Sequence, residues 1–312
     1  MPRLGAMPPH ARELDALVTE SGGDADLDYD RRPTEDLVAL MNRADREVPD
    51  AVFASSTEIA SGIDAIVERL QRGGRLVYAG AGSSGRIAAL DAAECESTFS
   101  TRPGQVVAVQ AGGPGASPLE QEAAEDDREA GGAAIRKLGI GPLDAVVGVS
   151  ASGRTPFVLG AAEEARRLGA LTVGVVAVEG SALEDLVQHQ IVVAVGPEFL
   201  AGSTRLKAGT AQKLVLNAIS TISMIRLGKT FGNLMVDVNA TNEKLRARVL
   251  RIVETATGVP GERAEEALSA ADGSTKVAIL TLLAEITPDE ARSLLAESSG
   301  NVRLALEQRE RS

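Results

Sequence analysis

Runs of apolar residues alternate with amphipathic segments through the middle of the chain. The apolar runs are predicted to form buried β-strands and lie near residues 75–80, 105–110, 144–149, 171–178 and 191–196. The segments between them have helical spacing and lie near residues 84–92, 117–138, 155–168 and 181–187. Strands that alternate with helices in this way predict an α/β fold, a parallel five-stranded sheet flanked by helices.

Helices are also predicted ahead of the first strand. Residues 1–32 contain Gly, Pro and Asp and are expected to form a flexible N-terminal segment, with one short helix near Ala11–Val18. A longer helix is predicted over Thr34–Val48 with its threonine as N-cap, and a second over Pro49–Arg72 that begins at the proline.

Beyond the last strand the chain is predicted to be helical. One long helix covers Ala208–Leu227, and another covers Thr241–Thr257 and ends at Gly258, a residue type that often terminates helices. Four short amphipathic helices follow, over residues 262–271, 274–284, 288–297 and 301–309. We therefore expect a sheet domain over residues 33–257 and a small helical module over residues 258–312.

The composition limits the classes of function. The 312 residues carry a formal net charge of −12 and a pI near 4.8, which argues against nucleic acid and membrane surfaces as partners. One cysteine, no signal-peptide pattern and no apolar run long enough to span a bilayer favour a cytoplasmic protein. With two histidines, neither a histidine-based triad nor a histidine metal site is expected, so acid–base chemistry falls first to carboxylates.

Three loops carry glycines and hydroxyl groups in a pattern that suits a phosphorylated ligand. Ala81–Arg86 follows the first predicted strand, Ser150–Pro156 follows the third, and Gly202–Thr210 opens the long helix. Glycines let the backbone approach a ligand, hydroxyls donate to phosphate oxygens, and the first turn of a helix favours an anion. The last loop lies in a stretch with five basic and no acidic residues, between Glu198 and Asp237. The loops lack a Walker lysine and Gly-x-Gly-x-x-Gly spacing, so ATP and NAD are disfavoured.

Several of these stretches occur together in one known family. The matching blocks are Leu17–Ser21, Gly80–Arg86, Leu90–Cys95, Ala124–Asp126, Ser150–Pro156, Gly196–Lys213, Gly232–Val238 and Ala240–Leu245. In this order they resemble the bacterial N-acetylmuramic acid 6-phosphate etherases, which have the sugar isomerase (SIS) fold. The block Gly196–Lys213 is the most specific, and the glucokinase regulatory proteins share it. The helical tail resembles the small ubiquitin-associated (UBA-like) module of the etherases.

The resemblance implies a lyase that splits the D-lactyl ether at C3 of N-acetylmuramic acid 6-phosphate, in cell-wall sugar recycling. In the ring-opened sugar the aldehyde acidifies the C2 proton. A base removes that proton, lactate leaves C3, and water adds to the alkene to give N-acetylglucosamine 6-phosphate. No metal and no cofactor are implied. By match to the family's motifs, Glu94 is the candidate proton donor and Glu125 the candidate base at C2.

The resemblance also implies a set of binding residues and a homodimer. The candidate substrate ligands are Ser83, Ser84, Ser150, Ser152, Thr155, Ser203, Thr204, Arg205 and Lys207. The hydroxyls in the loop 150–155 best match a phosphate site, whereas residues 203–207 would hold the lactyl carboxylate or close the site. How the loops divide these tasks is open. The apolar helix Leu214–Leu227 suits a dimer interface and equally an internal core helix.

The residues taken alone leave the roles of both carboxylates open. Glu125 lies in an acidic run that would suit a solvated helix face, and Glu94 lies toward the far end of a helix that leaves the ligand edge of the sheet. A short helix or a contact between subunits would resolve the second difficulty. Two departures from the family pattern affect substrate positioning: Glu96-Ser97 stand where two prolines are usual, and glycine replaces an asparagine near Gly23.

Two other functions compete with the etherase reading. A non-catalytic sugar-phosphate sensor resembling the glucokinase regulatory proteins would share the block Gly196–Lys213, but those proteins duplicate the sheet domain and this chain has one copy. An aldose–ketose isomerase on the same fold would also need a base beside C2, but would not need the etherase-specific blocks. Release of lactate distinguishes the etherase from both.

Overall fold

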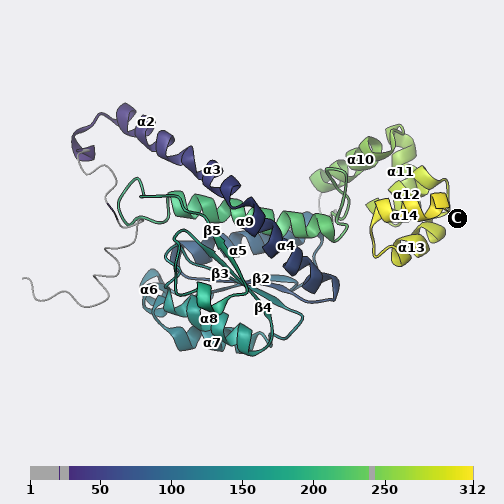
Figure 1. Cartoon of the computed structure of the whole chain (residues 1–312). Coiled ribbons are helices and arrows are strands. Elements are labelled where there is room, and N and C mark those ends of the chain that lie inside the picture. The colour runs from purple at the N-terminus through teal and green to yellow at the C-terminus, as the bar shows by residue number, and fades with distance from the viewer. Residues whose placement is uncertain (1–20, 22–27, 239–242, 312) are drawn as a thin grey trace, which may run out of the picture. The chain divides into compact units, whose positions relative to one another are not determined.

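The computed structural model describes residue 21 and the ranges 28–238 and 243–311. The helix expected at Ala11–Val18 lies outside the described residues, as does most of the segment 1–32. Contacts divide the chain into two compact units, residues 1–92 with 107–219 and residues 93–106 with 220–312. The first unit contains the large sheet, and the second is mainly helical (Figure 1).

The first unit is built on a five-stranded sheet with the strand order β2-β1-β3-β4-β5. The strands are β1 (Leu76–Gly80), β2 (Val106–Gln110), β3 (Ala145–Val149), β4 (Leu171–Val176) and β5 (His189–Val192). β1, β3 and β4 are buried along their whole length, which explains their unbroken apolar sequences. Because β3 pairs in parallel with both β1 and β4, the predicted α/β class is confirmed.

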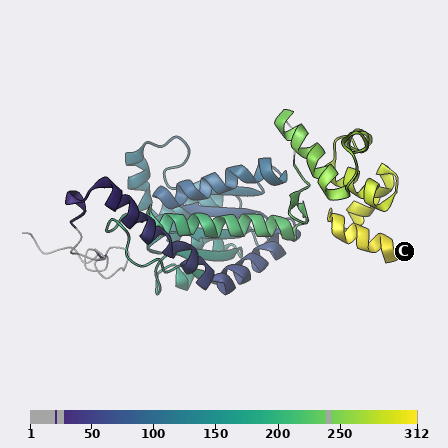
Figure 2. The same ribbon diagram turned by 90° about the horizontal axis from the view of Figure 1, so that it is seen from above.

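Helices cover both faces of this sheet, as Figures 1 and 2 show. The first face carries α4 (Ser56–Gln71) and the starts of α5 (Gly82–Phe99) and α9 (Lys207–Arg226). The opposite face carries α7 (Arg128–Lys137) and α8 (Pro156–Arg167). On the first face α4 packs closely, because a Cβ atom on Gly62 would lie 3.4 Å from the Ile191 side chain.

The helices of the α/β region differ from prediction in three places. The helix expected over 117–138 is divided into α6 (Pro118–Glu125) and α7, because Asp127 leaves the helix and caps α7 by accepting from the Ala130 N–H. The helix expected near 84–92 continues to Phe99. The segment near 181–187 forms only a short 3-10 turn, η3 (Glu184–Leu186).

The N-terminal helices also begin and end at other residues than predicted. A 3-10 turn, η2 (Tyr29–Arg31), precedes α2 (Thr34–Asp45), which is followed by α3 (Glu47–Ala54) and α4. Pro33, not Thr34, is the N-cap of α2, and it supplies no side-chain capping bond. Pro49 lies in the first turn of α3, where its missing N–H costs nothing.

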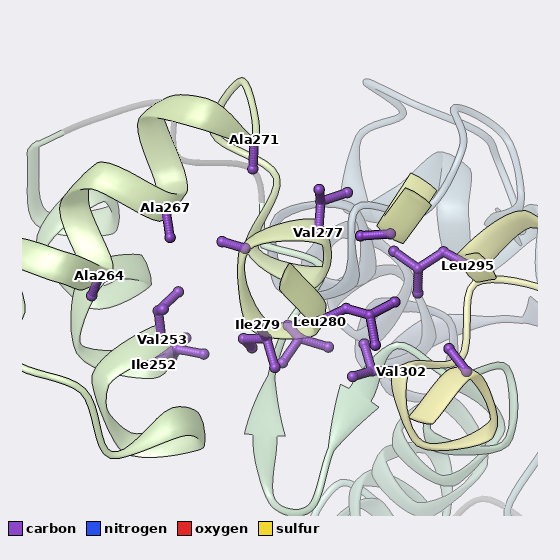
Figure 3. Packing of buried hydrophobic residues seen from close by; sticks show 14 residues of the cluster. Ile252, Val253, Ala264, Ala267, Ala271, Val277, Ile279, Leu280, Leu295 and Val302 are labelled. Atoms are coloured by element: carbon purple, nitrogen blue, oxygen red, sulfur yellow. The ribbon is translucent and has the colours of Figure 1, made fainter. Parts of the chain in front are cut away.

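The second unit packs helices and a short hairpin around an apolar core (Figure 3). Its helices are α10 (Glu243–Thr257), α11 (Gly261–Ala270), α12 (Thr275–Ala284), α13 (Pro288–Glu297) and α14 (Val302–Arg311). The hairpin strands β6 (Thr230–Phe231) and β7 (Leu234–Met235) are too short for a sequence pattern. Val253 of α10 shares the core with Leu280 of α12, so the expected boundary after residue 257 falls inside one core. The UBA-like resemblance of this tail stays a prediction.

Two kinds of feature are absent from the described ranges. No single helix there is both long and apolar enough to cross a membrane. The same residues contain no group of three or more His, Cys, Asp or Glu side chains placed to hold a metal ion.

Candidate active site

The strand order changes direction between β1 and β3, and open α/β sheets bind ligands beyond the carboxyl ends of strands at such a point. The last residues of these strands, Gly80 and Val149, are paired in the sheet register. The chain continues from them into Ala81–Arg86 and Ser150–Pro156, two of the three loops that the sequence singles out. The sheet therefore brings these two loops side by side at its carboxyl edge, and the ligand crevice that this topology predicts lies between them.

Glycines hold the start of α5 directly against the end of β1. A Cβ atom on Gly85 would lie 2.8 Å from the Gly80 carbonyl oxygen, so a larger residue would push the helix off the strand. Gly82, the first residue of α5, has φ +51°, a conformation that glycine adopts without strain. Ser83 and Ser84 consequently lie in the first turn of α5, half-buried and immediately beyond the strand.

The second loop is organised by the hydroxyl of Ser150. This residue is 2% exposed, and its Oγ accepts a hydrogen bond from the Gly153 N–H at 3.0 Å. The same Oγ lies 2.9 Å from Thr155 Oγ1 and 3.5 Å from Ser152 Oγ. Gly153 has φ +61°, and a Cβ atom there would lie 2.4 Å from the Ser181 side chain. The loop is thus fixed by its own hydroxyls and by a glycine that no larger residue can replace.

Glu125 reaches this crevice from the end of α6. A Cβ atom on Gly82 would lie 3.5 Å from Glu125 Oε2, so the carboxyl group lies beside the first of the two loops. Burial raises the pKa of Glu125, the charges of Asp126 and Glu122 raise it further, and the nearby Thr155 hydroxyl and the charge of Arg86 oppose the shift. A half-buried carboxyl group with a raised pKa in a ligand crevice has the setting of a general base.

The other acidic residues near Glu125 in the sequence are not buried in this way. Glu122, Asp126, Asp127 and Glu129 are all exposed, as the solvated-face alternative expects. Glu125 differs because it ends α6 and points toward the two loops rather than to solvent. The solvated-face alternative therefore does not describe Glu125.

Gln121 fixes α6 beside the crevice. Its Oε1 accepts from Arg86 Nη1 at 3.2 Å and from Gln110 Nε2 at 3.4 Å, and its Nε2 donates to the Ala116 carbonyl oxygen at 3.0 Å. The three contacts connect α6 to α5, to β2 and to the preceding loop. Sequence alone does not reveal Gln121, because Arg86 and Gln110 come from other elements, although the capping box formed by Ser117 and Glu120 is a recognisable start signal for α6.

Glycines also set the distance between α7 and α8. In the chain, α7 begins shortly after Glu125, and α8 begins at the end of the loop Ser150–Pro156. A Cβ atom on Gly131 would lie 1.9 Å from the Phe157 carbonyl oxygen, and one on Gly160 would lie 1.9 Å from the Arg128 carbonyl oxygen. The two backbones therefore touch. Because Phe157 follows Thr155 by two residues, and Arg128 follows Glu125 by three, this contact holds the carboxylate and the loop together.

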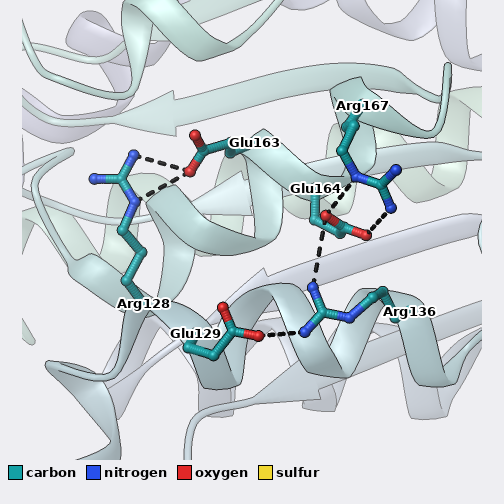
Figure 4. Close-up of polar contacts among 6 residues, drawn as sticks. All are labelled: Arg128, Glu129, Arg136, Glu163, Glu164 and Arg167. Atoms are coloured by element: carbon teal, nitrogen blue, oxygen red, sulfur yellow. Dashed lines mark hydrogen bonds and ion pairs between the residues drawn. The ribbon is translucent and has the colours of Figure 1, made fainter.

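Ion pairs surround the glycine contact between α7 and α8 (Figure 4). Arg128 pairs with Glu163 at 3.1 Å, and Arg136 pairs with Glu129 and with the buried Glu164. Arg167 donates two hydrogen bonds to Glu164, at 2.9 and 2.6 Å. Most of these side chains are exposed, so we assign the tight packing to the glycines and only a minor share of the stability to the ion pairs.

Gly131→Ala is expected to destabilise the chain by about 1–3 kcal/mol, because the added methyl group meets a backbone carbonyl that cannot move away. Gly132→Ala is the matched control. There the nearest atom would be the flexible Arg136 guanidinium at 3.4 Å, and alanine favours the helix, so no loss is expected. Urea unfolding of both variants measures the difference, and equal stabilities would contradict the close α7–α8 contact.

The third loop differs from its prediction. Glu198 is 4% exposed, and its two carboxylate oxygens accept from the N–H groups of Lys207 and Ala208 at 2.8 and 2.9 Å. The first turn of α9 therefore already holds an anion, and the expectation that its N–H groups are free for a ligand is wrong. Lys207 is buried and its Nζ pairs with Glu47 at 2.8 Å. Ser203 and Thr204 are half-buried and Arg205 is exposed in the preceding turn.

Comparison with known proteins decides the family. The chain is 57% identical over 293 residues to the N-acetylmuramic acid 6-phosphate etherase of Rubrobacter xylanophilus, an alignment that covers 94% of this chain and 97% of the relative. The chain belongs to the N-acetylmuramic acid 6-phosphate etherase family. The etherase of Streptomyces coelicolor is 55% identical over 94% of both chains, and that of Escherichia coli O81 is 46% identical over 95% of this chain and 99% of the relative.

Other comparisons concern parts of this etherase-family chain. The model of the glucokinase regulatory protein N-terminal SIS domain matches residues 58–165. A phosphoheptose isomerase from Francisella tularensis has a TM-score of 0.47 and 18% identity, over 60% of this chain and 98% of its own. The phosphoheptose isomerase GmhA from Neisseria gonorrhoeae has a TM-score of 0.47 and 19% identity, over 61% of this chain and 97% of its own.

The second carboxylate of the etherase motif lies in a different setting. Glu94 is exposed on α5 and belongs to the second unit, whereas Glu125 and the two loops belong to the first. Of the two alternatives, a short helix or a contact between subunits, the structure excludes the short helix: Glu94 is twelve residues beyond Gly82 on one continuous helix, a rise of about 18 Å along its axis. Ser97, for which the family resemblance predicts a proline, donates to the Glu94 carbonyl oxygen at 3.1 Å.

Proposed function

We propose that this etherase-family chain cleaves the D-lactyl ether of N-acetylmuramic acid 6-phosphate, by elimination followed by hydration, as a cytoplasmic carbon–oxygen lyase. The products are N-acetylglucosamine 6-phosphate and D-lactate. The observation that carries the proposal is 57% identity to a named etherase over nearly the whole of both chains. The position of Glu125 at the crevice between β1 and β3 supports it independently.

Glu125 is the base that removes the C2 proton in this proposal. A base must be deprotonated when substrate binds and must accept a proton readily, which a carboxylate of ordinary pKa does poorly near neutrality. Burial and the neighbouring Asp126 charge raise the pKa of Glu125 in the required direction. Its place at the crevice would set its carboxylate beside a sugar held by the loops.

The phosphate group would bind at the start of α8. The first N–H groups of a helix have no partner within it, and they favour an anion. At the start of α9 the Glu198 carboxylate accepts from these N–H groups. At the start of α8, in the described structure, the side chain of the N-cap residue Thr155 forms no capping hydrogen bond. Ser152, Ser83 and Ser84 lie on the loops beside it and would donate to the phosphate or sugar oxygens.

Glu94 would protonate the departing lactate from a second copy of the chain. Its position far along α5 from Gly82 motivates this arrangement. Leu90, one turn earlier on the same helix face, is 50% exposed, and Leu214 on α9 is 36% exposed. Such apolar side chains would be covered in a homodimer with two-fold symmetry, in which each α5 would serve the crevice of its partner.

The test of the proposed function is the release of D-lactate from N-acetylmuramic acid 6-phosphate by the purified protein without added metal. Lactate and N-acetylglucosamine 6-phosphate in equal amounts are expected, with one solvent-derived oxygen in the sugar product when the reaction is run in ¹⁸O-labelled water. Tight binding of the sugar phosphate without lactate would indicate a sensor instead, and a ketose product would indicate an isomerase.

A further inference from the structure

A buried carboxyl group lies on the core-facing side of α5, where the helix otherwise carries small apolar residues. Asp91 is 4% exposed. Its buried neighbours on this side of the helix are Ala88, Ala92 and Cys95. A carboxylate is costly to bury unless other groups pair with it or donate hydrogen bonds to it. At Asp91, Tyr78 Oη donates to Oδ2 at 3.0 Å, and Lys213 Nζ lies 3.8 Å from Oδ1.

These two partners of Asp91 come from two elements that lie beside α5. Tyr78 is the middle residue of β1 and is completely buried, so its hydroxyl group has a fixed position. Lys213 lies on α9, which runs beside α5 in the same direction. A Cβ atom on Gly209 would lie 3.5 Å from the Ile87 side chain, and the contact of Lys213 with Asp91 follows four residues later on both helices. Asp91 therefore connects α5 to an inner strand and to the neighbouring helix.

This connection restrains the rotation of α5 about its own axis. The apolar contacts of the alanines are non-directional, so they set the distance of the helix from the sheet more firmly than its rotation. A carboxyl group that is contacted from two sides holds one orientation. The restraint matters because a side-chain tip lies about 6 Å from a helix axis, and a rotation of about 20° would move it by about 2 Å.

Glu94, the candidate proton donor, lies three residues after Asp91 on the same continuous helix. This spacing places the two side chains less than one turn apart. Glu94 is exposed, so the direction of its side chain follows from the rotation of α5. A misplacement of about 1 Å can cost about 100-fold in rate. A rotation of α5 that moves the Glu94 carboxyl group by about 2 Å would therefore remove it from the oxygen that it protonates.

We propose that Asp91 is a positioning residue for the proton donor: held by Tyr78 and Lys213, it fixes the rotation of α5 and thereby the direction of Glu94. The proposal rests on the proposed function, in which Glu94 protonates the departing lactate oxygen. It applies whether Glu94 serves the site of its own chain or that of a second copy, because it concerns a single helix. Asp91 acts through Glu94 and not on the substrate.

A misplaced proton donor should slow one step of the reaction and leave the preceding step intact. Glu125 takes the C2 proton, and the electron pair moves onto the aldehyde oxygen to form an enolate. In the next step the carbonyl group forms again, a double bond forms between C2 and C3, and lactate leaves with the C3–O electron pair and a proton from Glu94. When lactate leaves slowly, Glu125 returns a proton to C2 instead. In D2O it returns deuterium, because its carboxyl proton exchanges with the solvent.

Asp91→Asn tests the proposal in D2O, with deuterium at C2 of the recovered substrate and lactate measured together. Asparagine keeps the shape and an oxygen that can accept from Tyr78, but it lacks the charge that faces Lys213. We expect kcat for lactate release to fall roughly 10–100-fold while KM stays nearly unchanged. Deuterium should still enter C2, so the ratio of deuterium incorporation to lactate release should rise about 10-fold or more.

Tyr78→Phe provides the test if Asp91→Asn fails to fold. It removes only the hydroxyl group that donates to Asp91, and it should raise the same ratio by a smaller factor. Glu94→Gln should raise the ratio most, because it removes the proton donor itself. The three variants therefore share one kinetic signature, which a general loss of stability would not produce.

Thr172→Val is the matched control. Thr172 is completely buried at the start of β4, and its hydroxyl accepts from the Gln188 N–H at 3.2 Å. The variant also loses a buried hydrogen bond, but in none of the elements that hold Asp91, so its ratio should equal that of the wild-type protein. An unchanged ratio in both Asp91→Asn and Tyr78→Phe would overturn the proposal. Absence of lactate with the wild-type protein would instead overturn the proposed function.

Discussion

Glu125→Gln is expected to lower kcat for lactate release by about 10³-fold or more, at the upper end of the contribution of a general base. The amide has the size of the carboxylate but cannot take the C2 proton. Stability should not fall, because burial and acidic neighbours disfavour the charge at this position. Steady-state kinetics with thermal unfolding measures both effects. Glu122→Gln is the control: this exposed residue lies one turn earlier on α6, and losing its charge lowers the pKa of Glu125, so the base stays deprotonated and kcat at neutral pH should not fall.

The pH dependence of the wild-type enzyme gives a second readout of the same group. The base acts in its deprotonated form, so kcat/KM should fall as the pH drops through the pKa of Glu125. Because burial raises that pKa, the acidic limb should lie above the ordinary value of a glutamate, near 4.3. The same shift means that ionised Glu125 costs stability above its unfolded-state pKa, a cost that Glu125→Gln removes. A limb at the ordinary value would contradict the raised pKa.

Glu94→Gln should abolish lactate release as fully as Glu125→Gln if Glu94 is the proton donor. Where each site takes Glu94 from one subunit and Glu125 from the other, mixed dimers of the two inactive variants contain one intact site. Random exchange of subunits would then restore roughly a quarter of the wild-type activity. Mixing without any recovery, in a dimer shown to exchange, would place both carboxylates in the site of a single chain.

The sheet and the crevice could be predicted from sequence because their signals are local. Each central strand is buried along its length, so its sequence is an unbroken apolar run. Parallel strands place their carboxyl ends at one edge, so two Gly/Ser loops after β1 and β3 had to meet there. The division of the helix at Asp126-Asp127 was not visible, because acidic residues are also common on exposed helix faces.

The start of α9 could not be predicted correctly, because the sequence does not show which acidic side chains fold back onto it. The sequence shows hydroxyls, a glycine turn and cations, a combination that suits an anion. The anion turns out to be internal, since Glu198 lies nine residues before Lys207 and Glu47 lies 160 residues before it. The sequence reveals the cations and hydroxyl groups, but not that carboxylates of the same chain already pair with this helix start.

The environment of Glu125 was hidden for a similar reason. Among several acidic neighbours, nothing local marks the one that is half-buried. Its burial depends on α7 touching α8 at Gly131 and Gly160, a contact made by residues without side chains. In the sequence these glycines resemble helix-weakening residues, whereas in the structure they bring the base to its loop.

Asp237→Asn is expected to lower the free energy of unfolding by about 2–4 kcal/mol. Asp237 Oδ2 lies 2.7 Å from Lys229 Nζ and 2.9 Å from Lys276 Nζ, and the lysine side chains are only 19% and 12% exposed. Removing one charge leaves two mostly buried ammonium groups without their counter-ion. We place the loss slightly below the 3–5 kcal/mol of a fully buried pair because Asp237 is 29% exposed. Urea denaturation at neutral pH measures it.

Lys276→Met separates loss of charge balance from loss of packing. The cluster contains two cations and one anion, so removing the more buried cation leaves a neutral pair, and the free energy of unfolding should change by less than about 1 kcal/mol.

The loss of stability in Asp237→Asn should also depend on pH. Burial lowers the pKa of Lys276, and Asp237 opposes that shift. Without Asp237 the pKa falls further, so the folded state binds fewer protons than the unfolded state. The deficit of Asp237→Asn should then shrink as the pH rises toward about 10. A deficit that is constant with pH would mean that Asp237 acts through its shape and hydrogen bonds rather than its charge.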